Sequence, residues 1–121
     1  MRRCLRLLLL AAIISILIIQ TGLCSKPKKQ GTKQYYEATF TITAYCYGTR
    51  TSTGTVPKFG TVAADPYVLP YGTKLHIPGY GAGVVEDCGG AIIGNRLDIW
   101  LPTEEGCYAW GVRDKVVRVY Y

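Results

Sequence analysis

Four acidic side chains stand inside or beside apolar stretches of the sequence, where an ionised carboxylate is costly unless it is hydrogen-bonded or used. They are Asp65, Glu86, Asp87 and Asp98. Asp65 precedes a proline, and Asp87 precedes a Cys-Gly-Gly sequence. A structural interpretation therefore stays open for both, because an aspartate in a turn often accepts backbone N–H bonds. Asp98 has no such local explanation and is the strongest candidate for chemistry.

Asp98 lies in the sequence Leu97-Asp98-Ile99-Trp100-Leu101, where aliphatic residues alternate with an acid and an aromatic residue. Alternate residues of a strand share a face, so we expect Asp98 and Trp100 to lie together, opposite the aliphatic residues. An aromatic ring can stack on the apolar face of a sugar, and a carboxyl group in a low dielectric has a raised pKa. A protonated carboxyl can act as a general acid. The pattern thus indicates a glycan-binding groove with acid catalysis.

The elements that must position these residues are typical of a small β-rich domain. Apolar residues at every second position from Tyr36 to Ala44 predict a strand with one buried face. Further short strands are predicted at Thr61–Ala64, Thr73–Ile77, Gly83–Glu86, Leu97–Leu101 and Lys115–Tyr120. Six short strands in fewer than 90 residues favour a closed barrel, because closure leaves no strand edge unpaired.

One short helix is predicted after Pro102. Thr103 can cap its N-terminus, and Glu104 and Glu105 place negative charge in its first turn, where the helix dipole favours it. The predicted fold class is therefore all-β, with six strands in a barrel and one short helix.

The charge is distributed unevenly over the 121 residues, whose formal net charge is +6. Seven of the 14 Lys and Arg residues precede Tyr35 and no acid does, so residues 35–121 carry seven cations against eight acids. This argues against a nucleic-acid partner, since phosphate binding needs clustered cations on the folded domain itself. The chain has no CxxC motif and a single histidine, and no nucleotide or flavin motif is visible, so no metal or cofactor is expected.

The N-terminal part predicts export. Arg2 and Arg3 precede an apolar run, and the 19 residues from Leu7 through Ser25 carry no charge. Residues 1–25 are therefore expected to be an apolar helix that serves as a signal peptide or a membrane anchor, with lipid attachment at Cys24 as a third alternative. Residues 26–34 read as a basic linker, and residues 35–121 as the folded domain. Each alternative places the domain outside the cytoplasmic membrane, and contact with the membrane is expected only through the N-terminal segment.

Three of the five cysteines, Cys46, Cys88 and Cys107, fall within the predicted domain. An exported domain meets an oxidising or thiol-poor environment, so one disulfide among these three is expected. The pairing does not follow from the sequence, and one thiol would be left over.

Several longer motifs accompany the acids. They are Ala64-Asp65-Pro66, Leu69-Pro70-Tyr71-Gly72-Thr73, Glu86-Asp87-Cys88-Gly89-Gly90-Ala91-Ile92 and Gly94-Asn95-Arg96-Leu97-Asp98-Ile99. Together they resemble the 3D (three-aspartate) domain family of small Gram-positive cell-wall and spore-associated proteins, whose barrel also forms the catalytic core of membrane-bound lytic transglycosylase A. The three aspartates that name the family fall on Asp65, Asp87 and Asp98. The resemblance extends from about Tyr36 to Tyr121.

This resemblance implies a six-stranded double-psi β-barrel and cleavage of peptidoglycan glycan strands by lytic transglycosylation. It implies that Asp98 is the catalytic acid and base, supported by Asp87 and Asp65. Substrate contacts are expected from Thr43, Tyr45, Gly89, Gly90 and Trp100. Two alternatives stay open at this point. One is a wall-binding module that grips glycan without cutting it, as in expansins. The other is an inverting hydrolase, which needs a second carboxylate roughly 6.5–9.5 Å from the acid.

Overall fold

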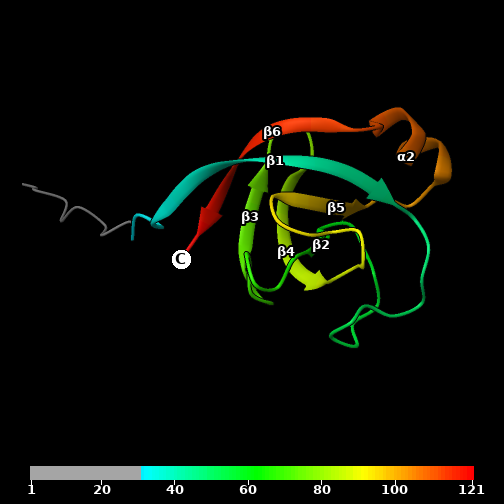
Figure 1. Cartoon of the computed structure of the whole chain (residues 1–121), viewed down its shortest axis with the longest axis horizontal. Helices are drawn as coiled ribbons and strands as arrows, with labels where there is room; N and C mark the ends of the chain where they lie inside the picture. The colour runs from blue at the N-terminus through cyan, green and yellow to red at the C-terminus, as the bar shows by residue number, and fades with distance from the viewer. Residues whose placement is uncertain (1–30) are drawn as a thin grey trace, which may run out of the picture. The chain divides into compact units, whose positions relative to one another are not determined.

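The computed structural model describes residues 31–121, which contain six strands and one helix (Figure 1). The elements are β1 (Tyr35–Tyr45), β2 (Thr61–Ala64), β3 (Lys74–Ile77), β4 (Gly81–Asp87), β5 (Arg96–Trp100), α2 (Glu104–Trp110) and β6 (Arg113–Tyr120). All six predicted strands and the predicted helix are confirmed, with strand ends shifted by one or two residues.

The expected signal or anchor helix at residues 1–25, and most of the linker at residues 26–34, lie outside the described residues. Within residues 31–121, no helix has the length and apolar character that a membrane crossing requires.

The strands close into a barrel in the order β1-β5-β2-β4-β3-β6. Strand β1 runs parallel to β5, and β2 runs parallel to β4, while the remaining neighbours are antiparallel. Strand β1 is long enough to pair with β6 along its first part and with β5 along its last part (Figure 1). The barrel is therefore closed, as predicted, and its sheet is mixed.

The interior of the barrel is filled by the aliphatic and aromatic positions that the alternating pattern predicts. In β5, Leu97 and Ile99 are fully buried, whereas Asp98 and Trp100 on the opposite face are half-buried. The other strands contribute Phe40, Ile42, Val62, Leu75, Ile77, Val85, Val117 and Val119 to the same core. Because a one-residue slip would move every core side chain of a strand to the other face, this packing fixes the strand register.

Helix α2 begins as the sequence predicts and packs against β1. The Gly106 N–H donates to the Oγ1 of Thr103 at 3.0 Å, which is the expected N-terminal cap. Near the other end of the helix, the indole Nε1 of Trp110 donates to the carbonyl of Ile42 at 3.0 Å. The helix is thereby held beside the second half of β1 (Figure 1).

A buried tyrosine joins the segment before β2 to the end of β5. Tyr80 follows the Pro78-Gly79 turn between β3 and β4, where Gly79 has φ of 82°. The Tyr80 hydroxyl accepts a bond from the Gly60 N–H at 2.6 Å and donates to the Trp100 carbonyl at 2.9 Å. One phenol therefore satisfies two backbone groups that lie far apart in the sequence.

We predict that Tyr80→Phe destabilises the domain by about 1–3 kcal/mol, because it leaves the Gly60 N–H and the Trp100 carbonyl without this partner. Urea unfolding followed by fluorescence measures the loss. Tyr108→Phe is the matched control, since Tyr108 is 84% exposed. Equal stability of the two variants would show that the bridge is not needed.

Candidate active site

A cleft of about 310 Å³ lies at the ends of β1 and β4. Tyr45 and Asp87, the last residues of those strands, line it together with Asp98 of β5. The rest of the lining is Tyr47, Ala63, Cys88, Gly89, Gly90, Ala91 and Ile92. The cleft therefore brings together five of the eight expected site residues, and two of the three aspartates are among them.

The strand register explains why residues so distant in the sequence meet here. Thr43 of β1 pairs with Asp98 of β5, Asp98 pairs with Ala63 of β2, and Ala63 pairs with Asp87 of β4. These four residues form a row across neighbouring strands, which are about 4.8 Å apart. The two aspartates are thus separated by a single small side chain, so space remains between them for a ligand.

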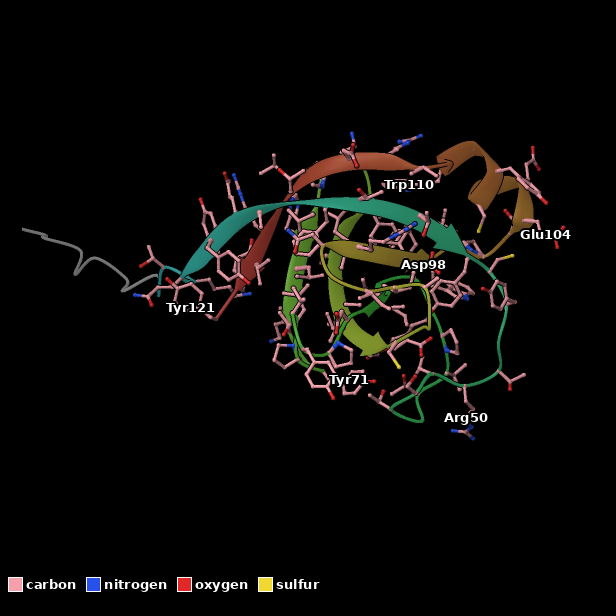
Figure 2. All side chains as sticks on the ribbon, in the orientation of Figure 1. Arg50, Tyr71, Asp98, Glu104, Trp110 and Tyr121 are labelled. Carbon is pink, nitrogen blue, oxygen red and sulfur yellow. The ribbon has the colours of Figure 1, made fainter. Side chains whose placement is uncertain are left out.

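Asp98 is half-buried, and Figure 2 shows it on β5 near the C-terminal end of β1. The hydroxyl of Thr43 donates to its Oδ1 at 3.0 Å. Burial raises the pKa of Asp98, and the nearby charge of Asp87 raises it further. The hydrogen bond from Thr43 and the charge of Arg96 act in the opposite direction, but the net pKa stays above the usual value. Asp98 is therefore suited to hold a proton.

Asp87 is the opposite case. Its Oδ1 accepts bonds from the Ser52 N–H at 2.9 Å, the Ser52 hydroxyl at 2.7 Å and the Cys88 N–H at 2.9 Å. Its Oδ2 accepts a bond from the Tyr45 hydroxyl at 3.1 Å. Burial alone would raise the pKa of Asp87, but these bonds outweigh it and hold the pKa below its usual range. Asp87 is therefore suited to stay ionised.

The tyrosines of the Tyr45–Tyr47 segment form one wall of the cleft. Their ring centroids are 5.6 Å apart, and the rings meet edge to face. Burial, followed by the negative charge of Asp87, raises the pKa of Tyr45 far above its usual range. The Tyr45 phenol therefore remains a hydrogen-bond donor to Asp87 at any physiological pH.

Of the expected substrate contacts, Tyr45, Gly89 and Gly90 line the cleft. Thr43 is not part of the lining, but its hydroxyl bonds to Asp98. Neither glycine has a positive φ, and a Cβ on Gly90 would meet nothing within 4 Å. Backbone conformation therefore does not require these glycines. Trp100 is half-buried and is not among the residues that line the cleft, where the rings are those of Tyr45 and Tyr47.

Asp65 lies outside the cleft lining and anchors two loops. Its Oδ2 accepts a bond from the Gly94 N–H at 2.9 Å, and its Oδ1 accepts one from the Tyr67 N–H at 3.0 Å. The bond from Gly94, followed by that from Tyr67, lowers the pKa of Asp65. These are the contacts expected of an aspartate in a turn. They tie the segment after β2 to the segment before β5.

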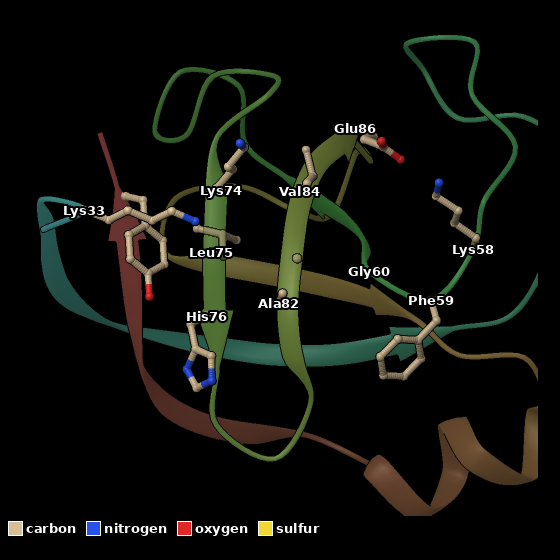
Figure 3. A pocket seen from close by; sticks show the side chains of 12 residues that line it. Lys33, Lys58, Phe59, Gly60, Lys74, Leu75, His76, Ala82, Val84 and Glu86 are labelled. Carbon is tan, nitrogen blue, oxygen red and sulfur yellow. The ribbon is translucent and has the colours of Figure 1, made fainter. Parts of the chain in front are cut away.

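Glu86 lies on a different surface of the barrel from its neighbour Asp87. It lies in a hollow of about 340 Å³ on the outer side of β3 and β4, together with Lys58 and Lys74 (Figure 3). Its Oε2 accepts bonds from the hydroxyls of Thr55 and Thr61 at 3.2 Å and 3.1 Å. The register between β2 and β4 shifts between Val62 and Ala63, so that Ala63 pairs with Asp87 and not with Glu86. Only Asp87 of this acidic pair lines the cleft.

Sequence analysis did not identify Ser52 as a site residue. It belongs to the loop between β1 and β2 and donates both its N–H and its hydroxyl to Asp87, 35 positions away. No local pattern reveals such a pair. The sequence shows only that a serine in a loop offers two donors, its N–H and its hydroxyl, with which it could orient a carboxylate.

The cysteines Cys46, Cys88 and Cys107 are free thiols in the structure, so the expected disulfide is not present. Cys88 lies in the cleft, and its Sγ is 3.1 Å from the Ser52 hydroxyl. Within residues 31–121, no group of three or more His, Cys, Asp or Glu side chains is arranged to hold a metal ion.

Comparison with known proteins identifies relatives of this domain. Residues 60–121, which include all three aspartates, match the 3D domain. Two Bacillus subtilis proteins are each 40% identical over 63 residues: Cell wall-binding protein YocH, and YabE, whose name refers to cell wall shaping. These residues cover 52% of this chain, but only 22% of YocH and 15% of YabE. The chain therefore matches a small part of both relatives.

We predict that the two aspartates of the cleft affect stability with opposite signs. Because the pKa of Asp98 is raised, its ionised form costs stability above that pKa. Asp98→Asn should therefore melt up to a few degrees higher than wild type at pH 7, with the gain fading in acid. The pKa of Asp87 is lowered, so its charge contributes stability that is lost as the pH falls. Asp87→Asn should melt lower at pH 7, and its deficit should shrink in acid.

Melting curves of wild type and both variants from pH 3 to pH 7 measure these differences. Shifts of the same sign in the two variants, or shifts that do not depend on pH, would show that the carboxyls do not differ in protonation.

Proposed function

Because the chain belongs to the 3D domain family, we propose that it acts on peptidoglycan of the bacterial cell wall, outside the cytoplasmic membrane. The names of YocH and YabE, which both refer to the cell wall, support this location. The predicted signal or anchor segment at residues 1–25 supports it independently. The cleft is then the place where a glycan strand binds.

The proposed activity is lytic transglycosylation at the bond between MurNAc and GlcNAc, with Asp98 as the single acid and base. The Asp98 carboxyl protonates the glycosidic oxygen, and the bond to C1 breaks through an oxocarbenium-like state. The resulting carboxylate then takes the proton of the C6 hydroxyl as that oxygen closes on C1. The product is a 1,6-anhydro sugar. Since an internal hydroxyl replaces water, one acid and base suffices.

The observation that carries this proposal is the contrast between the two carboxyls of the cleft. An ionised carboxylate has about four lone-pair sites, and Asp87 already accepts four hydrogen bonds. Asp98 accepts one from the described residues, that of Thr43. The bonds to Asp87 lower its pKa, which makes it a weak base for activating a water molecule and disfavours the inverting hydrolase. Asp98 has both a raised pKa and a free oxygen to present to substrate.

The other expected site residues take supporting roles in this scheme. The negative charge of Asp87 stabilises the proton on Asp98 and the positive charge of the transition state. Tyr45 is buried and holds Asp87 through its hydroxyl, whereas the exposed ring of Tyr47 can stack on sugar. Gly89 and Gly90 allow backbone to approach the sugar. Thr43 orients the Asp98 carboxyl. Asp65 holds the loop that leads into β5.

We also propose that the barrel has the double-psi topology. Support comes from its two parallel pairs, β1 with β5 and β2 with β4, joined to each other by the antiparallel pairing of β5 with β2. This is the arrangement that places Asp98 between Thr43 and Ala63.

A second candidate function is wall binding without cleavage. It is favoured by the name of the relative YocH, which describes binding only. The aromatic wall of the cleft would serve binding as well as catalysis, so products have to separate the two candidates.

We predict that the full chain releases muropeptides with 1,6-anhydro-MurNAc ends from purified peptidoglycan, and that Asp98→Asn lowers this rate about 100-fold or more. Cleavage should also fall as the pH rises through the pKa of Asp98, because the acid loses its proton. Mass spectrometry of the soluble products measures both effects.

Asp114→Asn is the matched control, because Asp114 lies on β6 and bonds to Thr41 outside the cleft. It should leave cleavage unchanged. Anhydro products from a folded Asp98→Asn variant would exclude Asp98 as the acid. Unchanged muropeptides with retained wall binding by the wild-type chain would establish the binding module instead.

A further inference from the structure

Cys46 lies between the two tyrosines that form a wall of the candidate cleft. It follows the end of β1 directly, while Cys107 is the fourth residue of α2. Both cysteines line a hollow of about 230 Å³, which Tyr45 and Tyr47 also border. The hollow and the cleft therefore share Tyr45 and Tyr47 in their linings.

Backbone packing brings the two thiols together without a covalent bond. The Leu101 N–H donates to the Tyr45 carbonyl at 2.9 Å, and the Trp110 indole donates to Ile42. These bonds hold the end of β1 against the chain that leads into α2 and against the helix itself. Cys46 and Cys107 consequently line the same hollow. Burial, and then the neighbouring Cys46, raises the pKa of Cys107.

Cys88 has different neighbours. Its Sγ contacts the Ser52 hydroxyl at 3.1 Å, and Cys88 raises the pKa of Tyr71, which Figure 2 labels on the side of the domain away from α2. The lining of the hollow at Cys46 and Cys107 does not include Cys88. Of the three pairings that these cysteines allow, the structure favours one.

We propose that Cys46 and Cys107 form a disulfide after export, and that this bond fixes the tyrosine wall of the cleft to α2. The location outside the cytoplasm and the role of the cleft rest on the proposed function. The bond forms by exchange with a small-molecule or enzyme disulfide. The thiolate of one cysteine attacks that disulfide, and the other cysteine displaces the mixed bond. The protein loses two hydrogens, and the oxidant leaves as two thiols.

The crosslink acts on the candidate site through Tyr45. The Tyr45 hydroxyl donates to Asp87, so a bond at the next residue restrains the donor that helps to keep Asp87 ionised. The closed loop runs from the end of β1 to α2 and encloses β2, β3, β4 and β5. Long loops of this kind lose much conformational entropy in the unfolded chain when they are crosslinked. Cys88 keeps a free thiol in the cleft.

Peptide mapping tests the pairing directly, because trypsin separates the three cysteines. Cys46 falls in residues 34–50, Cys88 in 75–96 and Cys107 in 97–113. The full chain is equilibrated with oxidised and reduced glutathione, alkylated, digested without reductant and analysed by mass spectrometry. We expect residues 34–50 linked to 97–113, with Cys88 alkylated. A link that includes Cys88, or alkylation of all three cysteines at an oxidising ratio, would overturn the proposal.

Thermal melting tests the consequence. Reductant should lower the Tm of the oxidised wild-type chain by about 5 °C or more. Cys46→Ser and Cys107→Ser should melt like the reduced chain and no longer respond to reductant, whereas Cys88→Ser should respond like wild type. A wild-type Tm that is the same with and without reductant would contradict the stabilising role. Mapping and melting use no glycan, so this proposal and the proposed enzymatic activity can fail separately.

Discussion

Burial of one carboxyl and hydrogen bonding of the other make two aspartates in one cleft chemically unlike, and the proposed function depends on this difference. Asp87 receives four hydrogen bonds and keeps its charge, while Asp98 is half-buried, receives one from Thr43 and holds its proton more readily. The negative charge of Asp87 opposes ionisation of Asp98 and therefore favours its protonated form. A carboxyl with a raised pKa thus shares the cleft with one whose pKa is lowered, which allows the two to take different roles.

The barrel supplies the geometry for this pair. Strand order and register place Asp98 and Asp87 on either side of Ala63, although β5 and β4 are not neighbours. The aliphatic residues on the opposite face of β5 pack into the core and stabilise the strand that carries Asp98. The raised pKa predicts that the ionised Asp98 lowers stability at neutral pH, as expected from a trade-off between stability and activity at a functional site.

Much of the fold, and the half-buried position of Asp98, could be predicted from local pattern. The alternation around Asp98 predicted its half-buried face, and Thr103 predicted the start of α2. The failures have a common physical cause, since they depend on which distant segments meet. Alternation placed Trp100 beside Asp98 but could not show that Tyr47 would line the cleft and that Trp100 would not. Likewise, no pattern joins Ser52 to Asp87, because the barrel brings that loop to the end of β4.

The most direct test of the central claim is a carboxyl titration of the folded domain by carbon NMR, with Asp98 and Asp87 assigned separately. The account predicts that Asp98 titrates above the usual value for aspartate, about 3.9, and that Asp87 titrates below it. In Ser52→Ala, which removes one donor to Asp87, the pKa of Asp87 should rise. A pKa of Asp98 at or below that of Asp87 in the wild-type domain would contradict this claim, since Asp98 would then not be the carboxyl of the cleft that holds a proton.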